Sequence, residues 1–218
     1  MFKNISTTIN RLRGSRHRPI FVALASCLCL VLVYTNYMHK KYLQVHSSTY
    51  APLLSLIAKA ESKGNYNAHF GSASNSSVKF TSMTIKEVMQ WQKDYVKTGS
   101  PSSAVGKYQI LSTTLSELVE QSGINENELY DEEMQDTLAV KLLERRGSTQ
   151  YVNKELSRDE FAANIAKEWA SLPKVVGNNP DDSYYQSDGL NKSLVKVDDV
   201  LEAIKPIGSK PLKPQSTR

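Results

Sequence analysis

The chain has 218 residues, which allows one globular domain with additional segments. Its formal net charge of +5 invites a nucleic-acid interpretation, but the distribution of charge argues against it. Residues 1–46 hold seven Lys and Arg and no Asp or Glu, so residues 47–218 carry 20 basic against 22 acidic residues. A nucleic-acid-binding domain needs its basic residues clustered on the folded part. We therefore expect no nucleic-acid partner.

Cysteine and histidine are too few and too scattered to indicate a metal centre. Cys27 and Cys29 are the only cysteines, and both lie in one apolar run. This excludes a disulfide-stapled domain and argues against a cysteine-based zinc site. The histidines offer no ligand pair at helical or zinc-finger spacing; they are His17, His39, His46 and His69. We expect neither a metal nor a cofactor.

The uncharged segment Ile20–Tyr37 (IFVALASCLCLVLVYTNY) predicts a membrane-spanning helix. At roughly 1.5 Å per residue it can cross about 30 Å of hydrocarbon if it extends slightly past its polar end. Four arginines precede the segment and two lysines follow it, and basic residues favour the cytoplasmic side. The sequence predicts a cytoplasmic tail over 1–19, a signal anchor over 20–38, a tether over 39–50 and a periplasmic domain. A virion membrane is an alternative location.

Three other interpretations of this segment remain. A cleaved signal peptide would have a shorter apolar run and a small-x-small site after it. Lipoprotein processing at Leu24-Ala25-Ser26-Cys27 has the right residue types, but the chain stays apolar through Leu28–Val33. A buried core helix fits poorly with the flanking basic residues.

Residues 51–204 are predicted to form a mainly helical domain with a small turn-rich or β lobe. Apolar residues at helical spacing from Leu53 to Glu61 predict a first helix that stops near Gly64. Asn65–Ser82 is rich in Asn, Ser and Gly and predicts the lobe, with a short hairpin.

Capping patterns predict the helices that follow. Thr84 and Ser157 each begin a Ser/Thr-x-x-Glu capping box, and Asp131 is a suitable N-cap. We expect helices at about 84–95, 110–121, 131–146, 157–169 and from near 198. The Pro- and Lys-rich segment 205–218 predicts a disordered tail.

Glu61 is a candidate catalytic acid because it lies near the end of an apolar helix face, just before Gly64. Leu54, Ile57 and Ala58 share its side of the helix. Partial burial there disfavours the ionised carboxylate and raises its pKa. A general acid that protonates a leaving sugar oxygen needs such a shift. On this pattern by itself, a surface glutamate at a helix end is the commoner case.

Two further stretches offer groups that suit a sugar-binding cleft. Tyr108 and Gln109 follow a run of small residues and provide an aromatic face and an amide. The alternative is a loop-to-helix junction with Tyr108 packed inward. Trp169 on an amphipathic helix is more often a core residue, whereas Tyr184 and Tyr185 in a polar loop are better candidates for sugar stacking.

Taken in order along the chain, these stretches resemble the lambda-type endolysins, phage lytic transglycosylases of the lysozyme-like superfamily. Four motifs carry the resemblance, over roughly residues 52–190. They are Glu61-Ser62-x-Gly64, then Gly106-Lys107-Tyr108-Gln109-Ile110-Leu111-Ser112, then Gln135-Asp136-x-Leu138-Ala139, then Trp169-Ala170-Ser171-Leu172-Pro173 with a later Tyr185-Gln186. The second and fourth motifs are quite specific as a pair.

The resemblance implies an α+β lysozyme-like fold and peptidoglycan glycan strands as the partner. It implies Glu61 as the catalytic residue. The groups it implies for holding the glycan are Ser62, Tyr108, Gln109, Tyr185 and Gln186. The N-terminal anchor and a longer insertion between Pro173 and Tyr185 depart from the family pattern.

The choice of reaction depends on a second carboxylate. A hydrolase commonly uses one to activate water or to act as nucleophile. Residues 62–86, the whole lobe after Glu61, contain no Asp or Glu. In a lytic transglycosylase the C6 hydroxyl of N-acetylmuramic acid attacks its own C1, so one glutamate can serve as acid and then as base. We expect that reaction, with a muramidase-type hydrolase as the alternative.

The sequence is compatible with several biological roles for such an enzyme. Cell lysis, local wall opening from a virion membrane, and a secretion apparatus all fit a membrane-anchored domain, as does an anchor that is later released. A different class is a non-catalytic, membrane-tethered protein that binds the wall or assists assembly. Detection of 1,6-anhydro products would separate the enzyme from that class.

Overall fold

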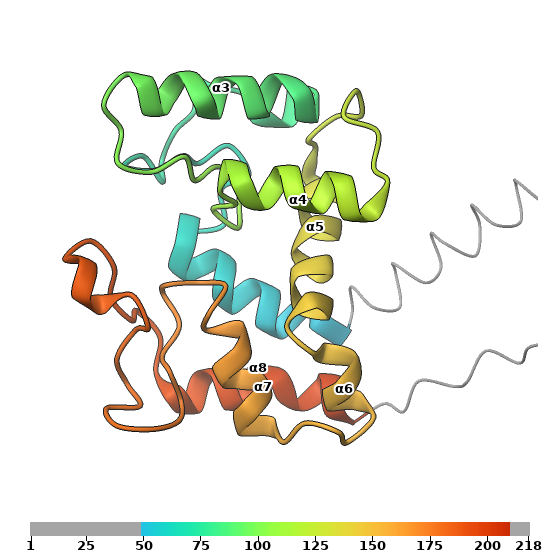
Figure 1. Ribbon diagram of the computed structural model, residues 1–218, viewed down its shortest axis with the longest axis vertical. Helices are drawn as coiled ribbons and strands as arrows, with labels where there is room; N and C mark the ends of the chain where they lie inside the picture. The colour runs from blue at the N-terminus through green and yellow to red at the C-terminus, as the bar shows by residue number, and fades with distance from the viewer. Residues whose placement is uncertain (1–48, 210–218) are drawn as a thin grey trace, which may run out of the picture. The chain divides into compact units, whose positions relative to one another are not determined.

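The computed structural model describes residues 49–209, all within the unit His46–Arg218, and they form the mainly helical domain that the sequence predicts. Figure 1 shows α3 (Ile85–Lys97) and α4 (Ser112–Ser122) at one end and α7 (Arg158–Ile165) and α8 (Val197–Gly208) at the other. The helix over residues 49–62 and α5 (Glu132–Arg145) lie between these pairs, and α6 (Ser148–Val152) follows α5. Short 3-10 turns lie at Phe80–Ser82 (η2) and Gln186–Asp188 (η3).

The predicted anchor Ile20–Tyr37, the tail 1–19 and most of the tether lie outside the described residues. Within residues 49–209, every helix is too short or too polar to cross a membrane. Residues 49 and 50, assigned to the tether, belong to the first helix instead. Tyr50 is buried and its hydroxyl donates a hydrogen bond to Ser148 Oγ at 3.0 Å, so packing against α6 fixes this turn.

The predicted helix caps are confirmed. Thr84 Oγ1 accepts from the Glu87 amide at 3.2 Å, and the Glu87 carboxylate accepts from the Thr84 amide at 2.7 Å. Ser157 and Glu160 form the same reciprocal pair at the start of α7. Asp131 accepts from the third amide of α5, so each of these helices has satisfied N–H groups in its first turn.

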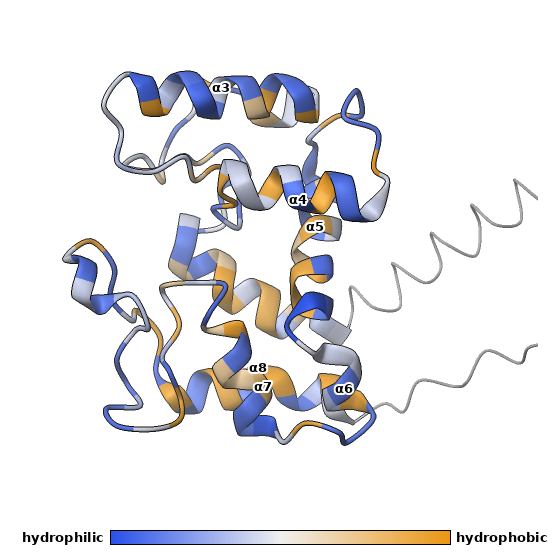
Figure 2. Cartoon of the chain, viewed as in Figure 1, coloured by the Kyte–Doolittle hydropathy of each residue, from blue (hydrophilic) through white to orange (hydrophobic). Residues whose placement is uncertain are grey.

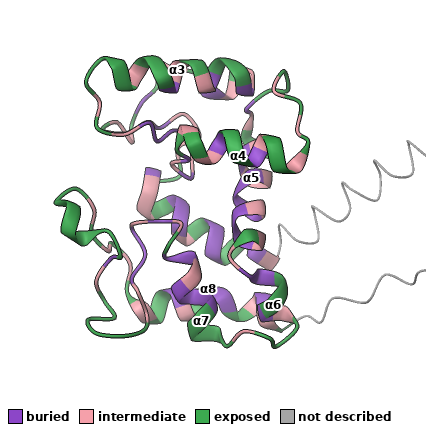
Figure 3. Ribbon diagram, in the orientation of Figure 1, coloured by how far each residue is buried: buried purple, intermediate pink, exposed green. Residues whose placement is uncertain are grey.

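One core holds the helices together. Figure 2 shows the apolar residues on the inward sides of the helices, and Figure 3 shows the same sides as buried. Fully buried side chains come from helices at both ends of the domain and from those between, and include Leu53, Ile85, Leu115, Leu138 and Ile204. The walls of the site described below are therefore fixed by packing that spans the whole domain.

Three predicted boundaries are wrong for physical reasons. The helix expected from 157 to 169 ends at Ile165, because the amides of Lys167 and Glu168 bond to carbonyls three residues back, in tighter turns. The helix expected from 110 begins at Ser112, because Ile110 pairs with Val105 in a two-way backbone bridge. Residues 205–208, assigned to the tail, belong to α8 instead: the helix continues through Pro206, and Ile207 is buried.

The lobe at 65–82 is turn-rich rather than a hairpin, with isolated bridges such as His69–Ser72. Side-chain amides take the role that strand pairing would have. Asn75 donates to the carbonyls of Asn67 and Val78, and Asn65 donates to the carbonyls of Ala73 and Asn75. These bonds hold the segment that leads from Glu61 toward His69.

Gly106 should tolerate a side chain less well than Gly71, the glycine of the lobe at 65–82. Its φ is +79°, and an added Cβ would lie 2.4 Å from Gln135 Oε1, which accepts the Lys107 amide. Gly106→Ala strains the left-handed backbone and also displaces the hydrogen bond between Gln135 and the Lys107 amide. Gly71→Ala strains a similar backbone, with φ at +78°, but its Cβ would enter open space. We expect the free energy of unfolding to fall by about 1–3 kcal/mol more for Gly106→Ala. Urea denaturation measures this, and equal losses would contradict the close approach.

Candidate active site

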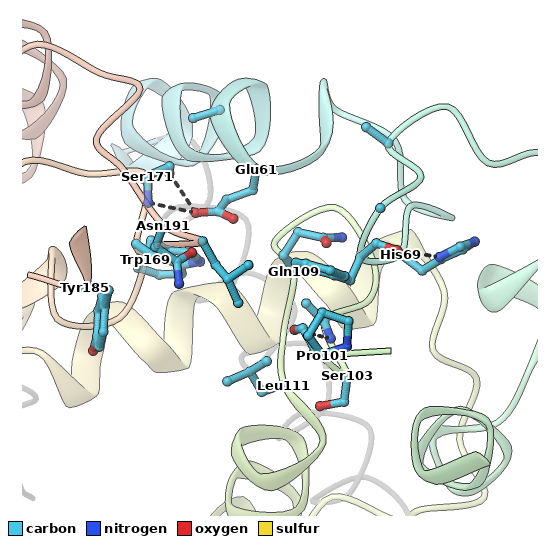
Figure 4. A pocket seen from close by; sticks show the side chains of 18 of the residues that line it. Glu61, His69, Pro101, Ser103, Gln109, Leu111, Trp169, Ser171, Tyr185 and Asn191 are labelled. Atoms are coloured by element: carbon cyan, nitrogen blue, oxygen red, sulfur yellow. Dashed lines mark hydrogen bonds between the residues drawn. The ribbon is translucent and has the colours of Figure 1, made fainter. Parts of the chain in front are cut away.

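A cavity of about 970 Å³ opens beside the end of the first helix, and Glu61 lies in its wall. The lobe at 69–73 and the segment 101–112 form part of the lining, and the segments 168–171 and 185–194 complete it. Figure 4 shows Glu61 and Ser171 facing one another, with Tyr185 toward one end, His69 toward the other and Gln109 between. The carboxyl thus faces a trough with room on both sides rather than open solvent.

The Glu61 carboxyl is held by one neighbour from a distant part of the chain. Ser171 donates from Oγ to Glu61 Oε1 at 2.6 Å and from its amide at 3.4 Å. Glu61 keeps part of its surface open to the cavity, while the surrounding atoms exclude most solvent. This burial raises the pKa of Glu61, and the two Ser171 hydrogen bonds partly oppose that rise. Oε2 has no hydrogen-bond partner among the described residues and remains available to a ligand.

Two predicted glycan contacts, Gln109 and Tyr185, line the cavity. Gln109 has a positive φ of 49° and its amide donates to Gly106 O at 2.8 Å, which fixes the side chain. Tyr185 is 40% exposed, and its hydroxyl donates to Lys167 O at 2.7 Å. Each side chain is anchored at one end and presents surface to the cavity. Gln186 lies in η3 and is exposed, outside the lining residues.

The other two predicted contacts, Ser62 and Tyr108, lie inside the fold. Ser62 is fully buried, and its hydroxyl donates to Lys107 O at 2.7 Å. Tyr108 is 1% exposed and donates to Asp136 Oδ1 at 2.7 Å, so the packed-inward alternative describes it. Neither is among the lining residues, and their side chains support the site from behind.

A partly buried polar network ties this support together. Lys107 Nζ lies 3.1 Å from Asp136 Oδ1 and 2.7 Å from the Tyr66 hydroxyl, which also bonds to Asp136. Burial and the Asp136 charge raise the pKa of Tyr108, so it stays a neutral donor. The network joins the loop after Glu61 to α5 and to the segment that carries Gln109.

Trp169 is 3% exposed, yet it lines the cavity and connects two of its walls. Its indole N–H donates to Tyr108 O at 3.1 Å. The early end of α7 turns the chain so that Trp169 packs inward and Ser171 reaches Glu61. The expectation of a core residue is therefore confirmed, and the same residue positions the donor to Glu61.

Several lining residues were missed from the sequence, namely His69, Glu168, Ser171, Asp188 and Lys192. Ser171 belongs to the Trp-Ala-Ser-Leu-Pro motif, which marks the segment as part of the family pattern. The motif does not predict the contact of Ser171 with Glu61. Glu168 and Asp188 lie far from the lobe in sequence, so the sequence does not predict that they line the same cavity.

The described part of the chain contains no group of three or more His, Cys, Asp or Glu side chains that could hold a metal ion. The lining carboxylates are instead engaged with protein groups. Glu168 accepts from Arg145 and Arg146 at 2.8 Å each. Asp188 accepts from the amides of Leu190 and Asn191 and from the Asn191 side chain.

A family model described as Endolysin matches residues 51–197, which is more than half of the chain and includes all the lining residues. No curated protein and no solved structure matches the chain.

Removal of the Ser171 hydroxyl should raise the pKa of Glu61 further. The hydroxyl favours the ionised carboxylate, so its loss in Ser171→Ala leaves burial less opposed. At a fixed pH near that pKa, a larger fraction of Glu61 is then protonated. Carbon NMR titration of the Glu61 carboxyl measures the shift.

Ser193→Ala is the matched control, because that hydroxyl bonds to Val195 O and does not contact Glu61. An unchanged or lowered pKa of Glu61 in Ser171→Ala would show that the 2.6 Å bond does not form in solution.

Proposed function

This chain belongs to the endolysin family and is thus a peptidoglycan-degrading enzyme, and we propose that it is a lytic transglycosylase with Glu61 as its single acid and base. The family match supports wall degradation. The observation that carries the finer proposal is Glu61 itself, a half-enclosed carboxyl with one oxygen held by Ser171 and the other open to the cavity.

Because burial raises the pKa of Glu61, its carboxyl can hold the proton that the first step requires. The protonated carboxyl donates to the glycosidic oxygen between N-acetylmuramic acid and N-acetylglucosamine as the bond from that oxygen to C1 breaks. The leaving sugar takes the proton as its new hydroxyl, and Glu61 is left ionised. Ser171 then stabilises the anion through its hydroxyl and amide donors.

The second step returns the proton. The C6 hydroxyl of the muramic-acid residue attacks C1, and the ionised Glu61 accepts the hydroxyl proton. A 1,6-anhydro ring forms, Glu61 is protonated again, and water is not consumed. One carboxyl group that alternates between two protonation states is sufficient for this sequence.

The other carboxylates of the cavity support this choice over hydrolysis. A hydrolase commonly uses a second carboxylate that is free to activate water or attack C1. Glu168 is neutralised by two arginines and is 7% exposed at its side chain. Asp188 is exposed, and three N–H donors lower its pKa and occupy both oxygens. The hydrogen bonds that Glu168 and Asp188 make within the protein therefore disfavour either carboxylate as a general base.

Gln109 and Tyr185 would contact the glycan, since both are anchored and both line the cavity. The Tyr185 ring offers a face for a sugar, and the Gln109 amide offers a donor and an acceptor. Ser62 and Tyr108 would act by positioning, through Lys107 O and Asp136.

Glu61→Gln should keep the fold and lose activity, because an amide cannot donate a proton. We expect cleavage of purified sacculi to fall by at least about 10²-fold, the lower range for loss of an acid–base group. Mass spectrometry of the released muropeptides should show 1,6-anhydro ends from the wild type.

Glu120→Gln is the control, since Glu120 is exposed on α4 and does not line the cavity. Full activity of Glu61→Gln would refute the role of Glu61. Reducing muramic-acid ends in place of anhydro ends would indicate a hydrolase.

Ile20–Tyr37 would hold the enzyme in a membrane with the catalytic domain on the periplasmic side. The uncharged run and the arginines before it support this location. The expressed chain should then stay with membranes through salt and carbonate washes. Leu28→Arg combined with Val31→Arg should release it, because each mid-span arginine costs about 2.5–3.5 kcal/mol on insertion. Release of the unaltered chain by carbonate would contradict the anchor.

A further inference from the structure

The segment 185–194 gives one lip of the cavity an unusual surface. Tyr185, Leu190 and Leu194 all line the cavity, and they are 40%, 64% and 57% exposed. Val96 and Leu111 from the α3–α4 side also line it and are about as exposed as Tyr185. Exposed apolar side chains that gather at one cavity indicate a binding surface rather than chance exposure.

Lys192 lies among these residues and brings a positive charge to the lining. It is exposed, and within residues 49–209 no ion pair or side-chain hydrogen bond engages its ammonium group. The two other carboxylates of this part of the lining are engaged with other groups. Glu168 is paired with arginines, and both oxygens of Asp188 accept N–H groups.

The lip is fixed in place from below. Leu194 donates its amide to Ser171 O at 2.8 Å, and the Tyr185 hydroxyl donates to Lys167 O. Asp188 accepts the amides of Leu190 and Asn191, which sets the turn just before Lys192. The same Ser171 therefore holds Glu61 with its hydroxyl and the lip with its carbonyl.

We propose that Lys192, together with Leu190 and Leu194, binds the short peptide that peptidoglycan carries on its muramic-acid sugars. This rests on the proposed function, which places a glycan strand in the cavity. The lactyl group and the alanine side chains of that peptide present methyl groups, and the peptide also carries free carboxylates. An apolar lip with one unpaired cation complements both features. The N-acetylated sugars also present methyl groups, but they carry no carboxylate where the lactyl group is linked to the peptide, so the charge distinguishes the peptide from the glycan.

The test compares soluble peptidoglycan strands with the same strands after their peptide carboxylates are converted to amides. Amidation keeps the bulk and removes the charge. The wild type should show a kcat/KM about two- to fivefold higher on the charged strands, the size of one exposed ion pair. This preference should shrink as salt rises, because exposed charges are screened.

Lys192→Ala should abolish the preference by slowing cleavage of the charged strands to the rate on amidated strands. Lys192→Arg should keep it. Lys196→Ala is the matched control, an exposed lysine of the following segment that does not line the cavity.

A wild type without preference, or a Lys192→Ala variant that keeps it or slows both substrates equally, would overturn the inference while leaving Glu61 as the acid. A wild type that cleaves neither substrate would overturn the proposed function, and the inference with it.

Discussion

The hydroxyl of Ser171 and the carboxyl of Glu61 meet at 2.6 Å although 110 residues separate them in the chain. One partner ends the first helix of the domain, and the other lies in the irregular segment after α7. Their contact can form only when the helices between them are packed in place. The contact gives the partly enclosed carboxyl of Glu61 the hydrogen-bond donor that a buried polar group requires. The arrangement of the site depends on this bond.

The residues around this contact divide into those that face the cavity and those that hold them. Trp169 joins the Ser171 segment to Tyr108 O, and Tyr108 is held in turn by Asp136. Lys107 completes the link to the loop after Glu61. This chain of partly buried polar groups runs behind the cavity. Substitutions in it would act on the geometry of Glu61 without touching a ligand.

Local features of the fold were predictable from the sequence, because short-range chemistry determines them. The capping boxes at Thr84 and Ser157 need only residues three positions apart, and both form. The glycine stop after the first helix is equally local. Boundaries that depend on tertiary contacts were not predictable. The Val105–Ile110 bridge shortens one helix, and burial of Ile207 extends another through Pro206.

The site shows the same division. Glu61 could be proposed from its place at the end of an apolar helix face, and the structure puts it in a cavity wall. Whether Tyr108 faces a ligand or the core depends on Asp136, which lies 28 residues further along the chain. The carboxylates of Glu168 and Asp188 reach the cavity from segments that are distant in sequence. Their engagement with arginine and amide groups appears only in three dimensions.

We propose that Glu61 delivers a proton to a glycosidic oxygen in this cavity. A crystal structure of Glu61→Gln with a bound muramic-acid-containing oligosaccharide tests it most directly. We expect the oligosaccharide to occupy the trough between His69 and Tyr185, with one glycosidic oxygen within about 2.6–3.2 Å of the residue 61 amide. An oligosaccharide bound on another face, or one whose glycosidic oxygens all lie beyond the reach of residue 61, would contradict it.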